Sequence, residues 1–457
     1  MAWVAAAAIS ALIGLLQYFG FAPALEPWIS QTQAGEAFAN LRQRNQFATL
    51  TSIGLTALLG WLAMQAEAPH RWRMPGWAYL LALLLALGNA ASSSRTGLLQ
   101  WVLIGVLTAW WSLPGRRRLL LFAGQALLAY GVAVFALPLL LQWATGLQTG
   151  GLFGRLVGDI PACASRKILW SNVLTLIADR PYLGWGWGEL DYAHFITLYP
   201  GPRFCEILDN AHNLPLQLAV ELGIPAAIVL CGGLAWLVWR ARPWREENPV
   251  RQMAWCVLAV IGLHSLLEYP LWYGPFQIAA VLAAWLLFSS RAATLPAGHE
   301  PASSVKQNNR FAQYVRALVA IFMVAILAAV AFSYHQVSQL YLQPEKRSAA
   351  YRDNTLDKVR GNRVFTEQAR FAELSLTPLT LGNAAFVHAM ALQLLHYSPE
   401  PQVIEKVIES AVMLGQEAQA LHYLARYRAA FPKEHALWAE KTRHPVVVPN
   451  PQVGAPP

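Results

Sequence analysis

The sequence contains few charged residues. Only 13% of its 457 residues are Asp, Glu, Lys or Arg, whereas 56% are hydrophobic, and the mean hydropathy is +0.35. An average soluble domain carries about 25% charged residues. The composition therefore excludes an ordinary soluble globular chain and indicates a membrane protein.

A single basic patch is also missing. The formal net charge is +9, but the Lys and Arg residues are scattered between apolar segments. Membrane topology accounts for such an excess, so we expect a lipid bilayer and no nucleic acid as a partner. Nineteen Trp and fifteen Tyr are typical of rings at lipid–water boundaries.

Metal-binding and phosphate-loop patterns are absent. The four cysteines include no CxxC pair and no Cys/His spacing typical of a metal site. Glu189 and Asp191 are a possible but isolated acidic pair, so we expect no metal, and we expect no cofactor either. The glycines at 184–188 are not read as a phosphate-binding loop, because no strand precedes them and no helix follows.

No basic residue precedes the first apolar segment, residues 1–20. We therefore predict a membrane span there rather than a cleaved signal peptide. The span begins with almost no flank, and we expect that earlier spans are missing. Eight more spans are predicted, at about 46–65, 76–92, 97–113, 119–142, 213–239, 252–268, 274–290 and 313–333.

The distribution of Lys and Arg predicts the orientation of these nine spans. With Met1 in the cytoplasm, twelve basic residues fall in the inner connectors and three in the short outer ones. This places the central loop and the C-terminal region outside the cytoplasm. The predicted parts are membrane helices 1–142, a large outer loop 143–212, membrane helices 213–334, a helical domain 335–443 and a disordered tail 444–457.

The three outer arginines are Arg42, Arg44 and Arg95. An arginine at a span end can simply extend toward lipid head groups. However, Arg95 occupies a very tight turn between two spans, and Arg42 and Arg44 directly precede another span. Their positions favour a further role.

A polar stripe opens the predicted helix that runs from about 213 to Arg240. Asn213, Gln217 and Glu221 are spaced i, i+4, i+8 and share one face, with His212 at its outer end. Polar groups at membrane depth are costly, which favours a functional site. The alternative is that they only bond neighbouring helices.

The seventh span ends on the same outer side with His264, Glu268 and Tyr269, which the sequence therefore predicts near His212. A lone His at a helix end is more often structural, so this is supporting evidence.

The central loop combines aromatic and acidic residues. Trp185 and Trp187 lie beside Glu189 and Asp191, a combination that suits carbohydrate, although an interfacial aromatic belt is the alternative. Helical stretches near 163–179 are expected along the membrane surface. Cys163 and Cys205 lie in the same loop, in an oxidising compartment, so the sequence predicts a disulfide between them.

Residues 341–440 are charged and amphipathic and predict paired helices. Pro399 and Pro432 are 33 residues apart, which resembles the 34-residue tetratricopeptide period over one and a half repeats. The domain is interpreted as a protein-docking module or as a helical cap on the membrane domain.

Four stretches together resemble one family: residues 42–48, 94–97, 210–223 and 264–270. They are similar to the O-antigen ligase/polymerase (Wzy/WaaL) superfamily, and the nearest branch is the PglL-type bacterial protein O-oligosaccharyltransferases. The resemblance covers roughly residues 35–440. It implies an all-α, GT-C-like polytopic membrane protein of the bacterial inner membrane, with the active site and C-terminus in the periplasm.

The resemblance further implies transfer of a preassembled glycan from an undecaprenyl-pyrophosphate carrier to Ser or Thr of an exported protein such as pilin. Arginines would stabilise the pyrophosphate without a metal ion. His212 would orient or deprotonate the acceptor hydroxyl, and Glu221 or Glu268 would fix its tautomer. The arginines assigned to pyrophosphate are Arg42, Arg44 and Arg95, with Arg166 as a further candidate.

Two kinds of alternative remain at this stage. Within the superfamily, the acceptor would be another glycan in a polymerase, or the lipid A core in a ligase. Outside it, the chain would be a flippase of polyprenyl-linked sugars. A transporter predicts polar groups distributed through the bilayer, whereas here they gather at one outer face.

Overall fold

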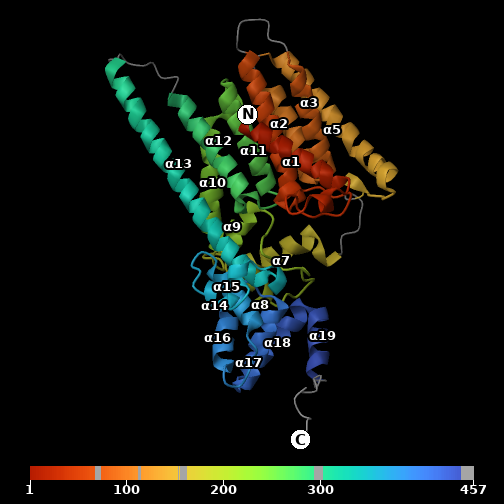
Figure 1. Ribbon diagram of the computed structural model, residues 1–457, viewed down its shortest axis with the longest axis vertical. Coiled ribbons are helices and arrows are strands. Elements are labelled where there is room, and N and C mark those ends of the chain that lie inside the picture. The colour runs from red at the N-terminus through yellow and green to blue at the C-terminus, as the bar shows by residue number, and fades with distance from the viewer. Residues whose placement is uncertain (67–73, 112–114, 153, 155–161, 293–301, 444–457) are drawn as a thin grey trace. The chain divides into compact units, whose positions relative to one another are not determined.

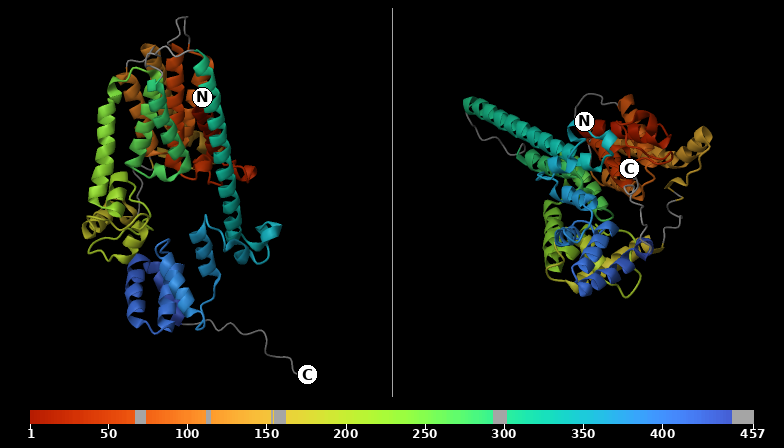
Figure 2. Two further views of the ribbon diagram at one scale, coloured as in Figure 1. Left: turned by 90° about the vertical axis from the view of Figure 1, so that its left-hand side faces the viewer. Right: turned by 60° about the horizontal axis from the view of Figure 1, so that its bottom comes forward.

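The computed structural model describes residues 1–66, 74–111, 115–152, 154, 162–292 and 302–443. Over these residues the chain forms α-helices and short 3-10 helices and no strand, which confirms the predicted all-α class. Two compact units are present (Figures 1 and 2). The first comprises residues 1–161, 210–219 and 225–296, and the second comprises residues 162–209, 220–224 and 297–457.

A helix lies at each predicted membrane span. The helices are α1 (Ala2–Tyr18), α2 (Arg44–Ala66), α3 (Gly76–Ala91), α4 (Arg95–Trp110), α5 (Arg116–Thr145), α9 (Leu214–Leu222), α10 (Ile224–Ala241), α11 (Pro249–Ser265), α12 (Gly274–Ala292) and α13 (Ala302–Ser338). Four stretches of the described chain are long and apolar enough to cross a membrane: Arg44–Ala66, Arg116–Thr145, Ile224–Arg245 and Gln313–Tyr341. The count of nine spans stays a prediction.

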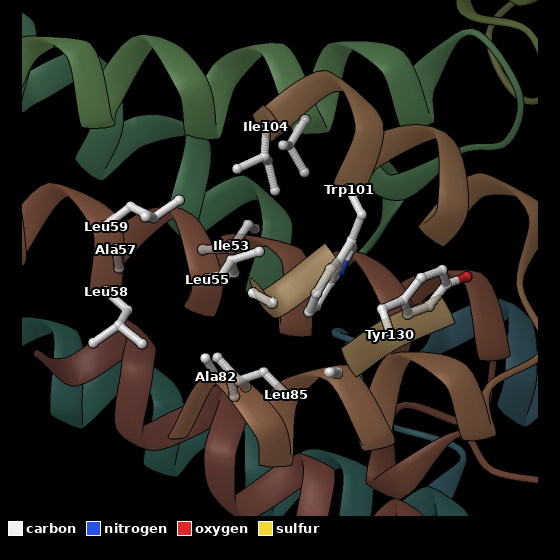
Figure 3. Packing of buried hydrophobic residues seen from close by; sticks show 14 of the residues in the cluster. Ile53, Leu55, Ala57, Leu58, Leu59, Ala82, Leu85, Trp101, Ile104 and Tyr130 are labelled. Carbon is white, nitrogen blue, oxygen red and sulfur yellow. The ribbon is translucent and has the colours of Figure 1, made fainter. Parts of the chain in front are cut away.

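Helix α2 forms the centre of the first unit. It packs against α1, α3, α4 and α11, and its apolar side chains are buried together with Trp101, which stacks on Tyr130 at 5.1 Å between ring centroids (Figure 3). Small residues bring the helices close, since a Cβ at Gly54 would collide with Ala7 of α1. Close backbone approach at small residues is the usual way in which membrane helices associate.

The helix predicted over 213–239 is broken, which corrects the single long helix expected from the sequence. Gly223 separates α9 from α10 and has a φ of +87°, where a side chain would be strained. A Cβ at this position would also collide with the carbonyl of Tyr182. The break frees helix carbonyls for other donors, because the amides of Trp185 and Gly186 donate to the carbonyls of Val220 and Glu221, both at 2.9 Å.

In the second unit, a segment of the central loop packs with the C-terminal helices. The unit contains α7 (Arg166–Asp179), α8 (Leu190–Ile196), α14 (Thr355–Val359), α15 (Thr366–Leu376), α16 (Ala384–Leu394), α17 (Pro401–Met413), α18 (Glu417–Ala430) and α19 (Pro432–Arg443). Phe195 of α8 is buried in the core that α16, α17 and α18 form, and Arg426 Nε donates to the carbonyl of Ile196 at 2.8 Å. The loop and the C-terminal helices therefore form one packed body.

Cys163 and Cys205 are joined in a disulfide, the pairing that the sequence predicts. The two cysteines are separated by 42 positions in the sequence, so the disulfide closes a long loop. In the chain-entropy account, the Cys205→Ser variant should lose roughly 2–4 kcal/mol of unfolding free energy in the second unit.

Peptide mapping without reductant should recover these two residues as one crosslinked pair, whereas Cys231 and Cys256, which are free, should be alkylated once the protein is denatured. Alkylation of all four cysteines without reductant would contradict the pairing.

Candidate active site

The backbone around His212 is held in an unusual conformation. His212 has a φ of +50°, in the left-handed region that costs energy for a residue with a side chain. Its amide donates to Asn210 Oδ1 at 2.8 Å, and the amide of Ala211 donates to Gln217 Oε1 at 2.6 Å. Since side chains from both flanks hold these amides, the position of His212 is determined by its surroundings rather than by local preference.

Glu268 fixes the imidazole ring of His212. His212 Nδ1 lies 2.5 Å from Glu268 Oε2, and its ring packs against that of Tyr269 in a T-shaped arrangement, with centroids 5.0 Å apart and an interplanar angle of 74°. A carboxylate accepts hydrogen bonds, so we assign the proton to Nδ1 and leave the lone pair on Nε2. The His212 side chain keeps 20% exposure, whereas Glu268 is buried. The pair is therefore arranged as a base with its orienting acid.

Two further residues extend this arrangement, and neither was predicted from the sequence to have a role. Asn45 Nδ2 donates to Glu268 Oε1 at 3.2 Å, and Asn45 Oδ1 accepts from Ser94 Oγ at 2.6 Å. Ser94 also caps α4, accepting from the amide of Gly97 at 3.1 Å. Their positions in the sequence could have indicated a role for them. Asn45 follows Arg44 and Ser94 precedes Arg95, each within a motif that resembles the family.

Asn45→Ala should lower the turnover number by roughly 10- to 100-fold, because a hydrogen bond to a charged group is worth about 1.5–3 kcal/mol. The KM for donor should change little, since Asn45 touches Glu268 and not the site proposed for pyrophosphate. Ser94→Ala should have a smaller effect. Equal losses in turnover and in donor affinity would instead indicate general damage to the fold.

The predicted arginines differ in their surroundings. Arg95 is the first residue of α4 and is exposed, so its charge adds to the partial positive charge of a helix N-terminus. Arg42 is exposed and has a φ of +57°. Arg44 forms an ion pair with Glu36 at 2.7 Å, which neutralises it in this structure. Arg166 is exposed and lies in the second unit, as the first residue of α7.

The polar stripe of α9 supports the loops around it. Asn213 Nδ2 donates to the carbonyl of Leu266 at 3.0 Å, and Gln217 accepts from Ala211 as described above. Glu221 Oε1 accepts from the amide of Gly188 at 2.9 Å. Of the two carboxylates predicted to fix the tautomer, it is therefore Glu268 that contacts His212, because the turn after α11 delivers it there.

His264 is buried one turn before Glu268, near the end of α11, and its ring contacts neighbouring helices rather than His212. It is fully buried, and its Nδ1 lies 2.8 Å from Thr49 Oγ1, which also accepts from Gln100 Nε2 at 2.8 Å. These side chains come from α11, α2 and α4. They join the three helices by the interhelical hydrogen bonds common in membrane bundles.

The predicted glycan-binding residues of the central loop are mostly engaged. Arg180 covers the ring of Trp185 at 4.0 Å, so this face cannot stack on a sugar in the present arrangement. Glu189 Oε2 lies 2.7 Å from His396 Nδ1, and Asp191 is buried. Trp187 is exposed. Of the two rings singled out, Trp187 is the more exposed.

Two buried groups in α8 have pKa values shifted in opposite directions. Burial raises the pKa of the Asp191 carboxyl to about 7, and burial lowers the pKa of His194 to about 3. Between about pH 4.5 and 6 the folded state therefore holds the proton of Asp191, while the unfolded state holds that of His194. The folded and unfolded states therefore bind the same number of protons on these two residues. The contributions of Asp191 and His194 to the pH dependence of the unfolding free energy cancel.

The Asp191→Asn variant should reveal how His194 alone makes the free energy of unfolding depend on pH. The unfolded state of this variant binds one proton more than the folded state, so stability should rise with pH by about 1.4 kcal/mol per unit relative to wild type. His194→Gln should show the opposite slope, falling as pH rises. Hydrogen exchange of amides in α8 and α18 across this range measures both, and parallel pH profiles in all three proteins would contradict the assignment.

Three protein families match consecutive parts of the chain. The family described as "Protein glycosylation ligase" matches residues 37–63, "O-Antigen ligase" matches residues 80–231, and "Virulence factor membrane-bound polymerase, C-terminal" matches residues 252–444. These regions contain Asn45, Ser94 with His212, and Glu268, respectively. The matched regions therefore supply every residue of the hydrogen-bonded chain.

Two curated proteins of Acinetobacter baylyi are similar. A general O-oligosaccharyltransferase is 25% identical over 282 residues, covering 60% of this chain and 47% of the relative. A ComP-specific O-oligosaccharyltransferase is 26% identical over 257 residues, covering 54% and 43%. The chain spans about half the length of these relatives. No solved structure matches it significantly. Together with the motifs and the apolar helices, these matches confirm the predicted resemblance to the O-antigen ligase superfamily and its protein O-oligosaccharyltransferases, and they indicate a multi-pass membrane protein.

Proposed function

We propose that this protein transfers a preassembled oligosaccharide from an undecaprenyl-pyrophosphate carrier to Ser or Thr of exported proteins such as pilin. The reaction takes place at the periplasmic face of the bacterial inner membrane. The observation that carries the proposal is the hydrogen-bonded chain from Ser94 through Asn45 and Glu268 to His212. The names of the two relatives support a protein acceptor.

His212 acts as the general base. Its Nε2 accepts the proton of the acceptor hydroxyl while that oxygen attacks the anomeric carbon of the glycan. The bond between this carbon and the phosphate oxygen breaks, and undecaprenyl pyrophosphate leaves with the electron pair. The imidazolium that forms is stabilised by Glu268 and later returns its proton to water. Asn45 keeps the carboxylate of Glu268 turned toward the ring.

Arg95 and Arg42 stabilise the leaving pyrophosphate. A guanidinium offers a rigid pair of donors that matches phosphate oxygens, and it keeps its charge at all working pH values. We extend the proposal to a metal-independent reaction in which these arginines balance the developing negative charge. The transfer rate should accordingly stay unchanged when EDTA is added, and a chelator-sensitive rate restored by Mg²⁺ or Mn²⁺ would overturn this part.

A polymerase or a ligase is the second candidate, because two of the matching families carry those descriptions. The same base and arginines would then serve a sugar hydroxyl as acceptor. The site chemistry is shared, so the acceptor decides between the functions.

The test offers one lipid-linked glycan donor to the purified protein in lipid nanodiscs with three separate acceptors. These are a pilin, a glycan on a lipid carrier, and lipid A core, and mass spectrometry identifies the product. Glycosylated pilin supports the proposal. Transfer only to the glycan or only to the lipid A core would establish the second candidate, and no transfer to any acceptor would refute both.

A further inference from the structure

The connection between α1 and α2 forms a pocket at the outer end of the first unit, on the side predicted to face the periplasm. The cavity has a volume of about 260 Å³ and is lined by Glu26, Trp28, Gln31, Asn40 and Arg42, among others. Drug-sized ligands usually occupy about 300–1,000 Å³. The cavity is therefore suited to a small group such as one sugar ring.

Trp28 is unusual in being almost completely exposed on a well-fixed backbone. Its side chain is 82% exposed. Asn40 holds the backbone around it, because Asn40 Nδ2 donates to the carbonyl of Trp28 and Asn40 Oδ1 accepts from the amide of Ser30, both at 2.9 Å. The ring is thus presented to the outside by a rigid loop.

A buried glutamine at the end of α1 fixes both arms of this loop. Gln17 is fully buried, and its Nε2 donates to the carbonyls of Ser30 and Ala39 at 2.9 and 2.8 Å. Its Oε1 accepts from the amides of Phe38 and Ala39 at 3.0 and 2.7 Å. Four hydrogen bonds from one side chain hold the pocket in shape before any ligand arrives, which lowers the entropic cost of binding.

The charged groups of the pocket are available to a ligand. Within the described chain, the side chains of Glu26 and Arg42 make no hydrogen bond or ion pair with another residue. Arg42 lies three residues before Asn45, which contacts Glu268 and through it His212. The pocket therefore offers an aromatic face, a carboxylate and an arginine, and its Arg42 is close in sequence to the proposed catalytic chain. Sugar C–H groups stack on an aromatic face, sugar hydroxyls donate to a carboxylate, and phosphate binds an arginine.

We propose that this pocket, built on Trp28, Glu26 and Arg42, binds the sugar that is linked directly to the pyrophosphate of the donor. The inference rests on the proposed function, since it assigns a subsite for the same donor. Trp28 stacks on the sugar ring, Glu26 accepts from its hydroxyls, and Arg42 contacts the adjoining phosphate. The subsite makes the protein selective for the carrier-linked sugar rather than for the lipid alone.

The test measures binding rather than transfer. Native mass spectrometry in nanodiscs compares two probes, undecaprenyl pyrophosphate alone and undecaprenyl pyrophosphate carrying one N-acetylglucosamine. Wild type should prefer the sugar-bearing probe by roughly 2- to 10-fold, the range expected for one aromatic contact. Trp28→Leu keeps an apolar side chain for lipid but removes the ring, so this preference should disappear while affinity for the sugar-free probe is unchanged. Trp28→Phe should restore most of the preference.

Trp143 offers a matched control, because it is 86% exposed at the end of α5 and outside the pocket. Trp143→Leu should bind both probes like wild type. Three results would each overturn the subsite. Wild type and Trp28→Leu could prefer the sugar-bearing probe equally, wild type could show no preference, or Trp28→Leu could lose affinity for both probes equally. A wild-type preference that Trp28→Leu abolishes would support the subsite even if no acceptor were glycosylated, in which case the proposed function alone would fail.

Discussion

His212→Asn should reduce glycan transfer by roughly 10²- to 10⁴-fold, the usual cost of losing a general base. Asn is the informative replacement, because it tolerates the left-handed backbone that His212 adopts at a φ of +50°. It also stays polar beside Glu268 while lacking a ring nitrogen that can accept the proton of the acceptor hydroxyl. The loss should fall on the turnover number, and the affinity for the lipid-linked donor should stay close to wild type.

The measurement pairs single-turnover transfer to pilin with donor binding by native mass spectrometry. His422→Asn serves as the control, because His422 is exposed on α18 in the second unit. The transfer rate of Glu268→Gln should lie between the rates of this control and of His212→Asn. Gln can still contact Nδ1 of His212 but no longer stabilises an imidazolium. Normal glycosylation by His212→Asn at wild-type expression would remove the basis of the proposed mechanism.

Arg95→Ala should lose donor affinity as well as rate, with the rate falling by roughly 10²- to 10³-fold as for a preorganised charge partner. Arg95 is exposed at the first position of α4, where the helix N-terminus also attracts negative charge. Arg95→Lys should recover only part of both quantities, because an ammonium cannot reproduce the two-pronged contact of a guanidinium with phosphate.

Arg117→Ala provides a comparison at the start of another helix. Arg117 is the second residue of α5, is exposed, and lies in a connector predicted on the opposite side of the membrane. Its removal should leave donor binding and rate unchanged. Arg95→Ala with wild-type donor affinity and reduced turnover would instead assign Arg95 to the acceptor side of the reaction.

The sequence alone determined the features that depend on composition and local order. Low charge and long apolar runs predicted a helical membrane protein, and a helix lies at each predicted span. Short motifs indicated the superfamily before any comparison, and they contain His212, Arg95 and Glu268. The cysteine pairing also followed from the sequence, because only two cysteines lie in the central loop, which the sequence predicts outside the cytoplasm. These inferences need only the order of residues and the physics of the bilayer.

Tertiary structure decided which side chains meet. Glu268 rather than Glu221 contacts His212, and Asn45 of α2 and Ser94, the N-cap of α4, join them. Residues 45, 94, 212 and 268 are too far apart in sequence for any periodicity to relate them; only the packing of α2, α4 and α11 with the loop before α9 does so.

The break at Gly223 also depends on a segment that is distant in sequence. The backbone of 181–188 approaches the end of α9, where the carbonyls of Val220 and Glu221 accept its amides. A glycine inside an apolar run is compatible with a continuous helix, so the sequence pattern carries no sign of a partner segment. The hydrophobic pattern of a segment indicates which of its faces contacts lipid or the protein core. Its hydrogen-bond partners depend on which distant segments pack against it.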